Sequence, residues 1–195
     1  MRVKEGNKET DIIIAAIKVF AESGYHNAKI HKIAEVAGVA TGSIYVYYKN
    51  KETILLKIFE QLWTRLYNEL HRVAERTDIN SVEKFDNMID LLFDVFIQNP
   101  PLALVFVNEQ NHLLQQNPNG FTPYYEKFLD LGEHIVIEGI ESKTFNPNFD
   151  VKIIRSFIFG GLRHLLHQWA NNSQNFPLNE IRQNVKYFCK RGLLK

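Results

Sequence analysis

Residues 41–51 concentrate side chains that bind phosphates and the edges of bases. The stretch reads TGSIYVYYKNK and holds two short hydroxyl side chains, three phenols and two lysines. Hydroxyl and ammonium groups donate hydrogen bonds to phosphate oxygens, and short polar side chains reach base edges in the major groove of DNA. The composition therefore predicts a DNA contact. The expected DNA-binding residues are Lys29, Thr41, Gly42, Ser43, Tyr45, Val46, Tyr47 and Lys51.

The residues of this stretch have different expected roles. Gly42 lets the start of a helix lie close to the sugar-phosphate backbone, and the hydroxyl of Tyr47 donates to a phosphate. Lys51 adds a cation beside the free amides of the helix that begins there, and this pairing suits a phosphate. Tyr48, at the end of the short segment, is expected to pack inward as an aromatic plug.

Two short helices are needed to present these side chains. Apolar spacing predicts helices over residues 30–36 and 40–47, separated by three residues with Gly38 in the middle. Glycine adopts the left-handed conformation that ends a helix at low cost, and Ala34 is small enough for the two helices to approach. Ile44, with other apolar residues, fixes their crossing. This is a helix-turn-helix, which leaves one face of the second helix free for the major groove.

A structural helical hairpin in a protein that does not bind DNA is the alternative interpretation of this region. Such a hairpin would account for the turn glycine and the apolar wedge. It would not account for the hydroxyl-rich face or for the lysine after the tyrosine pair.

The rest of the chain also has helical periodicity, so the expected fold class is all-α. We expect a three-helix DNA-binding domain with the helix-turn-helix at residues 1–52 and a larger helical bundle at 53–195. Ser81 is the expected cap of one helix, and Pro101 is expected in the first turn of the next. The remaining predicted helices span 8–23, 51–75, 81–98, 101–116, 122–141, 150–171 and 178–192.

Composition narrows the class of protein. The chain has 195 residues, of which 45% are hydrophobic, enough for a sizeable core. Residues 1–51 carry 8 Lys/Arg against 5 Asp/Glu, whereas residues 52–195 carry 15 against 17. The single cysteine, Cys189, fits a reducing compartment, and neither a signal peptide nor a membrane-spanning run is visible, so we expect a cytoplasmic protein. Because the basic excess is modest, two copies on a palindromic operator are expected to bind together.

The segment GYHNAKIHKIAEVAGVATGSIYVYYKNKETIL resembles the DNA-binding domain of TetR-family transcriptional regulators. The shared features are a glycine-aromatic step, an isoleucine-alanine pair, alanine-glycine-valine in the turn, glycine-hydroxyl-apolar-tyrosine in the recognition helix, and tyrosine-aromatic-x-x-lysine-glutamate after it. The resemblance covers residues 10–56 and, more weakly, the whole architecture. It implies that the helical bundle at 53–195 serves for ligand binding and dimerisation. It also implies a homodimeric regulator that represses transcription and leaves its operator DNA when a small molecule binds.

The segment departs from the family pattern at several positions. Ala28 and Ala40 stand where relatives often have a capping Thr or Ser, so Asn27 or Thr41 is expected to take over the cap, and Lys29 is expected to restore phosphate attraction. Val46 stands where His is frequent, which suggests an apolar contact with a thymine methyl group.

The last two predicted helices carry apolar stripes that fit a four-helix dimer interface. The TetR resemblance implies dimerisation there, although the stripes would also suit the core of a single subunit. The expected interface residues are Ile158, Gly161, Leu165, Trp169, Val185 and Phe188.

Aromatic residues with sparse polar anchors in the middle helices have the composition of an apolar ligand cavity. The segment from IFGG to the following Trp is similar to acyl-CoA-responsive members of the family, so the expected effector is lipophilic, a fatty acyl-CoA being the specific hypothesis. The expected pocket residues are Phe96, Phe106, His112, Tyr124, Phe128, Phe157 and Arg163.

A helical-bundle metalloenzyme or small-molecule carrier is the alternative function. Glu109 and His112 have the Glu-x-x-His spacing of di-metal bundles, and His164 and His167 have the same spacing. A di-metal site requires two such motifs and two further glutamates, and the sequence has one motif. With no phosphate loop or nucleophile elbow, we expect no metal, no cofactor and no enzymatic activity.

Overall fold

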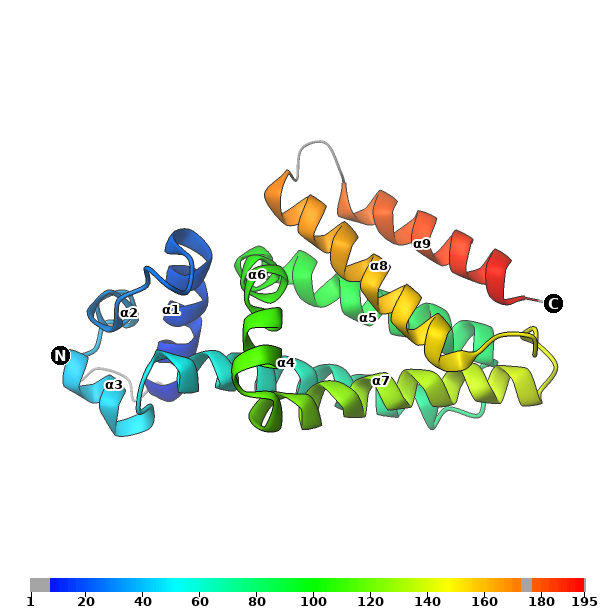
Figure 1. Ribbon diagram of the computed structural model, residues 1–195, viewed down its shortest axis with the longest axis horizontal. Helices are drawn as coiled ribbons and strands as arrows, with labels where there is room; N and C mark the ends of the chain where they lie inside the picture. The colour runs from blue at the N-terminus through cyan, green and yellow to red at the C-terminus, as the bar shows by residue number, and fades with distance from the viewer. Residues whose placement is uncertain (1–7, 173–176, 195) are drawn as a thin grey trace.

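The structure is a computed structural model that describes residues 8–172 and 177–194, and within these ranges the chain is helical (Figure 1). The only β-type pairing there is one isolated bridge between Phe145 and Leu194. The all-α prediction is thus confirmed. The helices are α1 (Lys8–Ser23), α2 (Ile30–Ala37), α3 (Thr41–Tyr47), α4 (Lys51–Ala74), α5 (Ser81–Gln98), α6 (Pro100–Gln116), α7 (Pro118–Glu141), α8 (Val151–Asn171) and α9 (Leu178–Leu193).

Asparagines cap α5, α6 and α7, which corrects the predicted cap of α5 and the predicted starts of α6 and α7. Asn80 caps α5, with its side chain accepting from the Glu83 N–H at 3.0 Å, and Ser81 is buried instead. Asn99 caps α6, which therefore begins one residue early. Asn117 accepts from the Gly120 N–H at 3.1 Å and starts α7 at Pro118 rather than at 122. Proline suits the first turn of a helix because the amide it lacks has no partner there.

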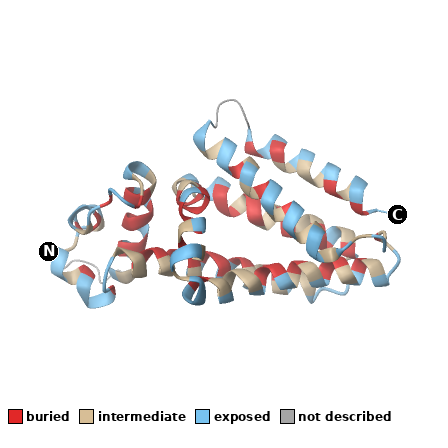
Figure 2. Ribbon diagram, in the orientation of Figure 1, coloured by how far each residue is buried: buried red, intermediate tan, exposed pale blue. Residues whose placement is uncertain are grey.

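Helix α4 links the two parts of the molecule. Figure 1 shows α1, α2 and α3 grouped at one end, with α4 running from this group along the larger bundle beside α7. One side of α4 is buried along its length, as Figure 2 shows. The boundary predicted at residues 52 and 53 falls inside this continuous helix and stays a prediction. The buried residues of α4 are Ile54, Leu55, Ile58, Phe59, Leu62, Trp63, Leu66 and Leu70.

Helix α6 lies between the two parts and packs against α1 on one side and α8 on the other. It follows α5 after a sharp bend of 111° at Asn99, which ends one helix and caps the next. Among the described helices, none taken singly has the length and apolar character of a membrane span. Helices α5 and α6 reach that composition only when counted together across the bend.

Ion pairs repeated every four residues along each helix join α9 to α5, and Arg182 Nη1 also lies 3.7 Å from Asp90 Oδ1. One rung is 2.6 Å long between Arg182 Nη1 and Asp94 Oδ1, and another is 2.9 Å long between Lys190 Nζ and Asp86 Oδ2. These ion pairs, called the α5–α9 ladder below, occupy one face of α9. The neighbouring apolar face of α9 therefore remains available for other contacts. The pairs are Arg182 with Asp94, Lys186 with Asp90, and Lys190 with Asp86.

We expect Gly139→Ala to destabilise the protein. Gly139 is buried near the end of α7, where an added Cβ would overlap the ring of Phe145, itself 1% exposed. Overpacking of a filled core costs about 1–3 kcal/mol, which should appear as a lower midpoint in chemical or thermal unfolding.

Gly192→Ala is the matched control. Gly192 lies in the last turn of α9, where an added Cβ meets no atom within 4 Å. This variant should be no less stable than the parent chain, because alanine is the better helix former. Equal midpoints for the two variants would show that the Phe145 ring can move aside.

Candidate DNA-binding surface and ligand cavity

The turn between α2 and α3 has the predicted geometry. Gly38 adopts a φ of 67°, and the Val39 N–H donates to the Ala34 carbonyl at 3.0 Å, closing the end of α2. Ile33, Ala34 and Ile44 are buried between the helices. The left-handed glycine and the apolar wedge therefore hold α3 against α2, which confirms the helix-turn-helix geometry.

The opposite face of α3 is open to solvent. Tyr45 is 56% exposed, Val46 78% and Tyr47 44%. Thr41 and Gly42 are also exposed, while Ser43 is half-buried. Large side chains that a folded protein leaves uncovered side by side mark an interaction surface. The DNA contacts assigned to these residues stay predictions, but the structure puts them on one accessible face at the end of the molecule (Figure 2).

Tyr48 packs inward, as predicted, and ties α3 to α1. It is 6% exposed, and its hydroxyl donates to Glu9 Oε1 at 3.2 Å. Burial, with the neighbouring Glu9 carboxylate, raises the pKa of this phenol well above its usual range, so the hydroxyl keeps its proton. Tyr48 is thus a structural residue, distinct from the exposed Tyr45 and Tyr47.

The expected replacement of the missing helix caps does not occur. Helices α2 and α3 both begin without a side-chain cap, at Lys29 and Ala40. Asn27 donates instead to the Ser23 carbonyl at 3.2 Å, and Thr41 is the first residue of α3 rather than its cap.

Lys51 has a structural task that the sequence did not reveal. Its Nζ donates to the carbonyl oxygens of Tyr25 and His26, each at 2.7 Å, and lies 4.6 Å from the Tyr25 ring centroid. Burial lowers the pKa of this ammonium group. An ammonium group has three N–H donors. The predicted phosphate contact of Lys51 therefore stays a prediction, with one donor left for it.

His112 lies at the junction between α6 and the DNA-binding part, not beside a ligand cavity as predicted. Its ring packs against Tyr25 and His26, with centroids 5.2 and 5.3 Å apart. One turn away, Glu109 is 8% exposed and its Oε1 accepts from the Tyr25 N–H at 3.4 Å. Both residues of the Glu-x-x-His motif thus contact the loop after α1. The described part of the chain contains no group of three His, Cys, Asp or Glu side chains that could hold a metal ion.

A candidate ligand site lies between α4, α5, α6, α7 and α8. A narrow inner cavity of about 20 Å³ adjoins an outer cleft of about 350 Å³, and the two share Gln110, Tyr125, Phe159 and Arg163. The inner cavity is otherwise mostly apolar, whereas the outer cleft adds Asn111, Glu126, Arg155 and Ser156 among others. The inner cavity is lined by Trp63, Leu92, Phe106, Gln110, Tyr125, Phe159, Leu162, Arg163 and Leu166.

The predicted pocket residues are only partly gathered at this site. Phe106 and Arg163 line the inner cavity. Phe96 packs on Phe106 with centroids 4.9 Å apart, and Phe128 packs on Trp63 at 5.4 Å, so these two support the cavity wall from behind. Tyr124 is half-buried against the core.

Trp63 lines the inner cavity without having been predicted, and Phe157, predicted for the pocket, lies elsewhere. The signal for Trp63 was an indole N–H within the apolar stripe of α4, since a buried indole N–H usually has a polar partner. Phe157 is 63% exposed on α8 and faces α9 rather than the inner cavity.

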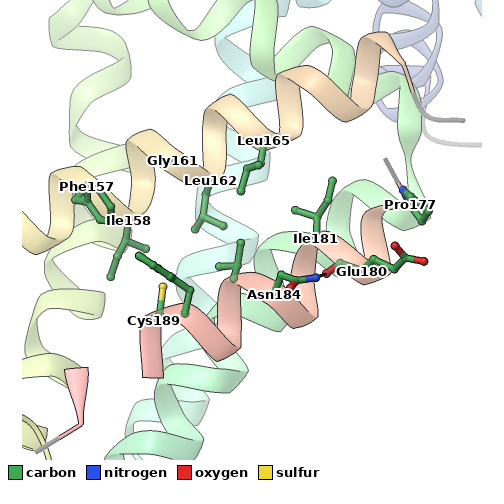
Figure 3. A pocket seen from close by; sticks show the side chains of 12 residues that line it. Phe157, Ile158, Gly161, Leu162, Leu165, Pro177, Glu180, Ile181, Asn184 and Cys189 are labelled. Carbon is green, nitrogen blue, oxygen red and sulfur yellow. Dashed lines mark hydrogen bonds between the residues drawn. The ribbon is translucent and has the colours of Figure 1, made fainter. Parts of the chain in front are cut away.

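An apolar groove of about 590 Å³ separates α8 from α9 (Figure 3). Phe157 and Phe188, which is 64% exposed, face each other across it with ring centroids 6.5 Å apart. Ile158 and other residues of the groove are buried in the single subunit. The apolar stripes of α8 and α9 therefore contribute partly to the core of the subunit and partly to its exposed surface. Of the predicted interface residues, Ile158, Gly161, Leu165, Val185 and Phe188 line the groove. Trp169 lies farther along α8, half-buried against the core.

Cys189, in this groove, should react slowly in the native protein. Burial raises the pKa of its thiol to about 11, with the Asp86 carboxylate adding to the effect. Because the thiolate is the reactive form, the reactive fraction at pH 8 is roughly 100-fold lower than for an unperturbed thiol. We expect slow alkylation by iodoacetamide at pH 8, measured by mass spectrometry, and fast alkylation in denaturant. Equal rates in the two conditions would contradict this description of the groove.

Two protein families, each matching a different part, together cover nearly the whole length of the chain. Residues 12–58 match the family described as "Bacterial regulatory proteins, tetR family". Residues 59–192 match the family described as "YsiA-like protein, C-terminal region". The "Fatty acid metabolism regulator protein" of Bacillus subtilis (strain 168) is 33% identical over 191 residues, covering 95% of each chain.

Solved structures of similar proteins have the same fold. The fatty acid degradation regulator FadR of Bacillus halodurans superposes with a TM-score of 0.85 at 30% identity, covering 97% of each chain. FadR of Bacillus subtilis, in complex with stearoyl-CoA, superposes with a TM-score of 0.83 at 31% identity, covering 94% of this chain and 98% of the other. The similarity extends over both the DNA-binding part and the larger bundle.

Proposed function

The chain belongs to the tetR family of bacterial regulatory proteins and is a ligand-responsive transcriptional repressor, and from this premise we propose which of its surfaces bind DNA, a second copy and the ligand. The exposed face of α3 enters the major groove of operator DNA. The α8–α9 groove is covered by the same helices of a second copy. The ligand is a fatty acyl-CoA, which binds in the inner cavity and outer cleft. The chain acts as a regulator and not as an enzyme.

The DNA-binding proposal is supported by the side chains that α3 leaves uncovered. Tyr45, Val46 and Tyr47 form a contiguous exposed face, while Tyr48 and Ile44 fasten the helix from behind. A recognition helix needs this division, because bases are read only from a helix whose orientation is fixed. Two such helices in a symmetric dimer read a palindromic operator.

The dimer proposal is supported by the apolar groove. A monomeric protein rarely leaves two phenylalanines as exposed as Phe157 and Phe188 in one apolar depression. With a twofold axis near this groove, each copy would insert its own aromatic side chains into the other.

The ligand proposal is supported by the similarity to FadR of Bacillus subtilis, whose structure is a complex with stearoyl-CoA, and by the shape of the site. The inner cavity has apolar walls for an acyl chain, and the outer cleft has polar and charged walls for the other end of the ligand. Since the inner cavity holds only about 20 Å³, an acyl chain can enter only when the lining side chains move. The ligand therefore favours a different conformation, which is the requirement for allostery.

The position of α6 is the observation that carries this proposal. One side of α6 supplies Phe106 and Gln110 to the inner cavity. Glu109 and His112, on the same helix, contact Tyr25 and His26 in the DNA-binding part. We propose that a ligand that displaces Phe106 or Gln110 shifts α6, and that this shift repositions the loop after α1, so that α6 couples the two sites.

The experiment that tests the function has two stages. Selection from a random double-stranded DNA pool, at moderate salt, should enrich a palindrome. Binding of that palindrome is then measured with acyl-CoA esters of increasing chain length, and long-chain esters should release the DNA and be recovered intact by mass spectrometry. Failure to enrich any sequence would contradict the DNA-binding proposal, and palindrome binding that no acyl-CoA changes would contradict the ligand proposal alone.

A further inference from the structure

Four buried side-chain atoms in the described part of the chain have hydrogen-bonding capacity but no partner, and three of them belong to residues that line the inner cavity. The three are Trp63 Nε1, Gln110 Oε1 and Arg163 Nε. The fourth, Asp86 Oδ1, belongs to the α5–α9 ladder instead. Three of the four unpaired atoms thus lie at one small cavity, which suggests that a ligand in this cavity supplies their hydrogen-bond partners.

The three side chains are held in place although these atoms are unpaired. Trp63 is 1% exposed and Gln110 is 3% exposed. Arg163 donates from Nη2 to the Val107 carbonyl at 3.1 Å, which fixes the guanidinium while its Nε remains without a partner. Leaving buried donors and acceptors unpaired is destabilising, and native proteins usually avoid it except where a ligand, ion or water supplies the partner.

We infer that Trp63, Arg163 and Gln110 bind the acyl carbonyl group of the ligand. This inference rests on the proposed function and adds the chemistry that the site recognises. The indole N–H and the Nε–H of Arg163 are both donors, so a carbonyl oxygen placed between them satisfies both. The three residues are therefore specificity-determining residues rather than part of an unselective apolar wall.

Gln110 distinguishes the two chemical sources of an acyl carbonyl. In a CoA thioester, an amide N–H follows two methylene groups beyond the sulfur, and this N–H can donate to Gln110 Oε1. A free fatty acid has the carbonyl oxygen but no such amide. Trp63 and Arg163 thus recognise the group that both ligands share, whereas Gln110 favours the thioester.

The other residues that line the inner cavity and the outer cleft determine the orientation of the bound ligand. From the inner cavity, Phe106, Leu162 and Leu166 offer apolar surface to the hydrocarbon chain. On the other side of Gln110 and Arg163, the outer cleft is lined by Asn111, Arg155 and further polar groups. The carbonyl group then lies at the boundary between apolar and polar walls, the place that it occupies in the ligand itself.

The test compares ligands that differ by the carbonyl oxygen. Operator release by the full-length protein is titrated with stearoyl-CoA, with S-octadecyl-CoA, a thioether that lacks the oxygen, and with stearic acid. The parent protein should require roughly 10- to 100-fold more thioether than thioester, because the thioether leaves both buried donors unpaired. Similar potency of thioester and thioether would overturn the inference while leaving the acyl-CoA function intact.

Two variants test whether Trp63 and Gln110 cause the difference in potency between the ligands. Trp63→Phe keeps an aromatic ring and removes the N–H, so it should weaken thioester and acid roughly tenfold and leave the thioether unchanged. Gln110→Met should weaken the thioester and the thioether equally, since both carry the amide N–H beyond the sulfur, and leave the acid unchanged. Without ligand, Gln110→Met should keep the melting temperature of the parent protein, whereas Trp63→Phe should lower it, because the smaller ring leaves a void in the core. Equal weakening of all three ligands would mean that the residues only shape the cavity.

Phe106→Leu is the matched control, because Phe106 lines the same cavity and offers no hydrogen bond. Thioester and thioether should both respond to this substitution, and by the same factor. A change in the thioester-to-thioether ratio in this variant would overturn the inference, since the ratio would then depend on cavity shape. If none of the three ligands released the operator from the parent protein, the acyl-CoA function itself would fail.

Discussion

Tyr45→Ala is expected to weaken operator binding by about two to three orders of magnitude while the protein remains folded and dimeric. Tyr45 lies on the open face of α3, with 56% of its surface exposed, so its removal leaves the core unchanged. A contact to a base or phosphate contributes about 1–3 kcal/mol, and a symmetric dimer loses it twice. Fluorescence anisotropy with the selected operator, at fixed salt, measures the change.

Two further variants make the Tyr45 result specific. Tyr45→Phe removes the hydroxyl alone and separates its hydrogen bond from the packing of the ring on DNA. Ile97→Ala changes a side chain that is also exposed, in the last turn of α5 and outside α3, and should leave operator affinity unaltered. A Tyr45→Ala protein that bound the operator normally, or that became monomeric, would mean that the recognition surface lies elsewhere.

Phe188→Asp is expected to convert the proposed dimer into monomers and thereby abolish operator binding at ordinary protein concentrations. Phe188 projects into the α8–α9 groove opposite Phe157. A carboxylate at this place would be buried without a partner on dimerisation, in both copies. Each copy loses at least about 2 kcal/mol, so the dimer dissociation constant should rise roughly 1,000-fold or more. Sedimentation equilibrium gives this constant directly.

Tyr187→Asp is the matched control for this prediction. Tyr187 is the preceding residue of α9 and is 63% exposed, yet it is not among the residues that line the groove. Its ring lies 5.5 Å from the Arg191 guanidinium carbon instead. The Tyr187→Asp protein should stay dimeric. If Phe188→Asp also stayed dimeric and bound the operator, the groove would have to serve a different purpose.

The features that the sequence predicted best are those determined by short stretches. The apolar period of each helix, the left-handed Gly38 and the inward Tyr48 depend on a few neighbouring residues, and all were predicted. The start of α7 was wrong because NPNG was interpreted as a loop. In the structure its Asn caps a helix and its Pro occupies the first turn.

The composition of the ligand cavity depends on contacts between distant helices and was therefore harder to predict. His112 and Phe106 lie six residues apart on α6, yet one contacts the DNA-binding part and the other lines the cavity. Which helix each one meets depends on how α1 and α8 pack against α6. The role proposed for Trp63 could not be predicted for the same reason, since the indole N–H draws attention only beside Gln110 and Arg163.

The narrowness of the inner cavity sets a limit on the speed of the response. The inner cavity, at about 20 Å³, has room for roughly one water molecule. The proposed acyl chain can therefore bind only after the side chains around Phe106 have moved apart. At low ligand concentration, the rate of operator release should grow with concentration. At high concentration, it should reach a plateau equal to the opening frequency of the protein itself. The packing of a few aromatic side chains would then determine the maximum rate at which the ligand releases the repressor from its operator.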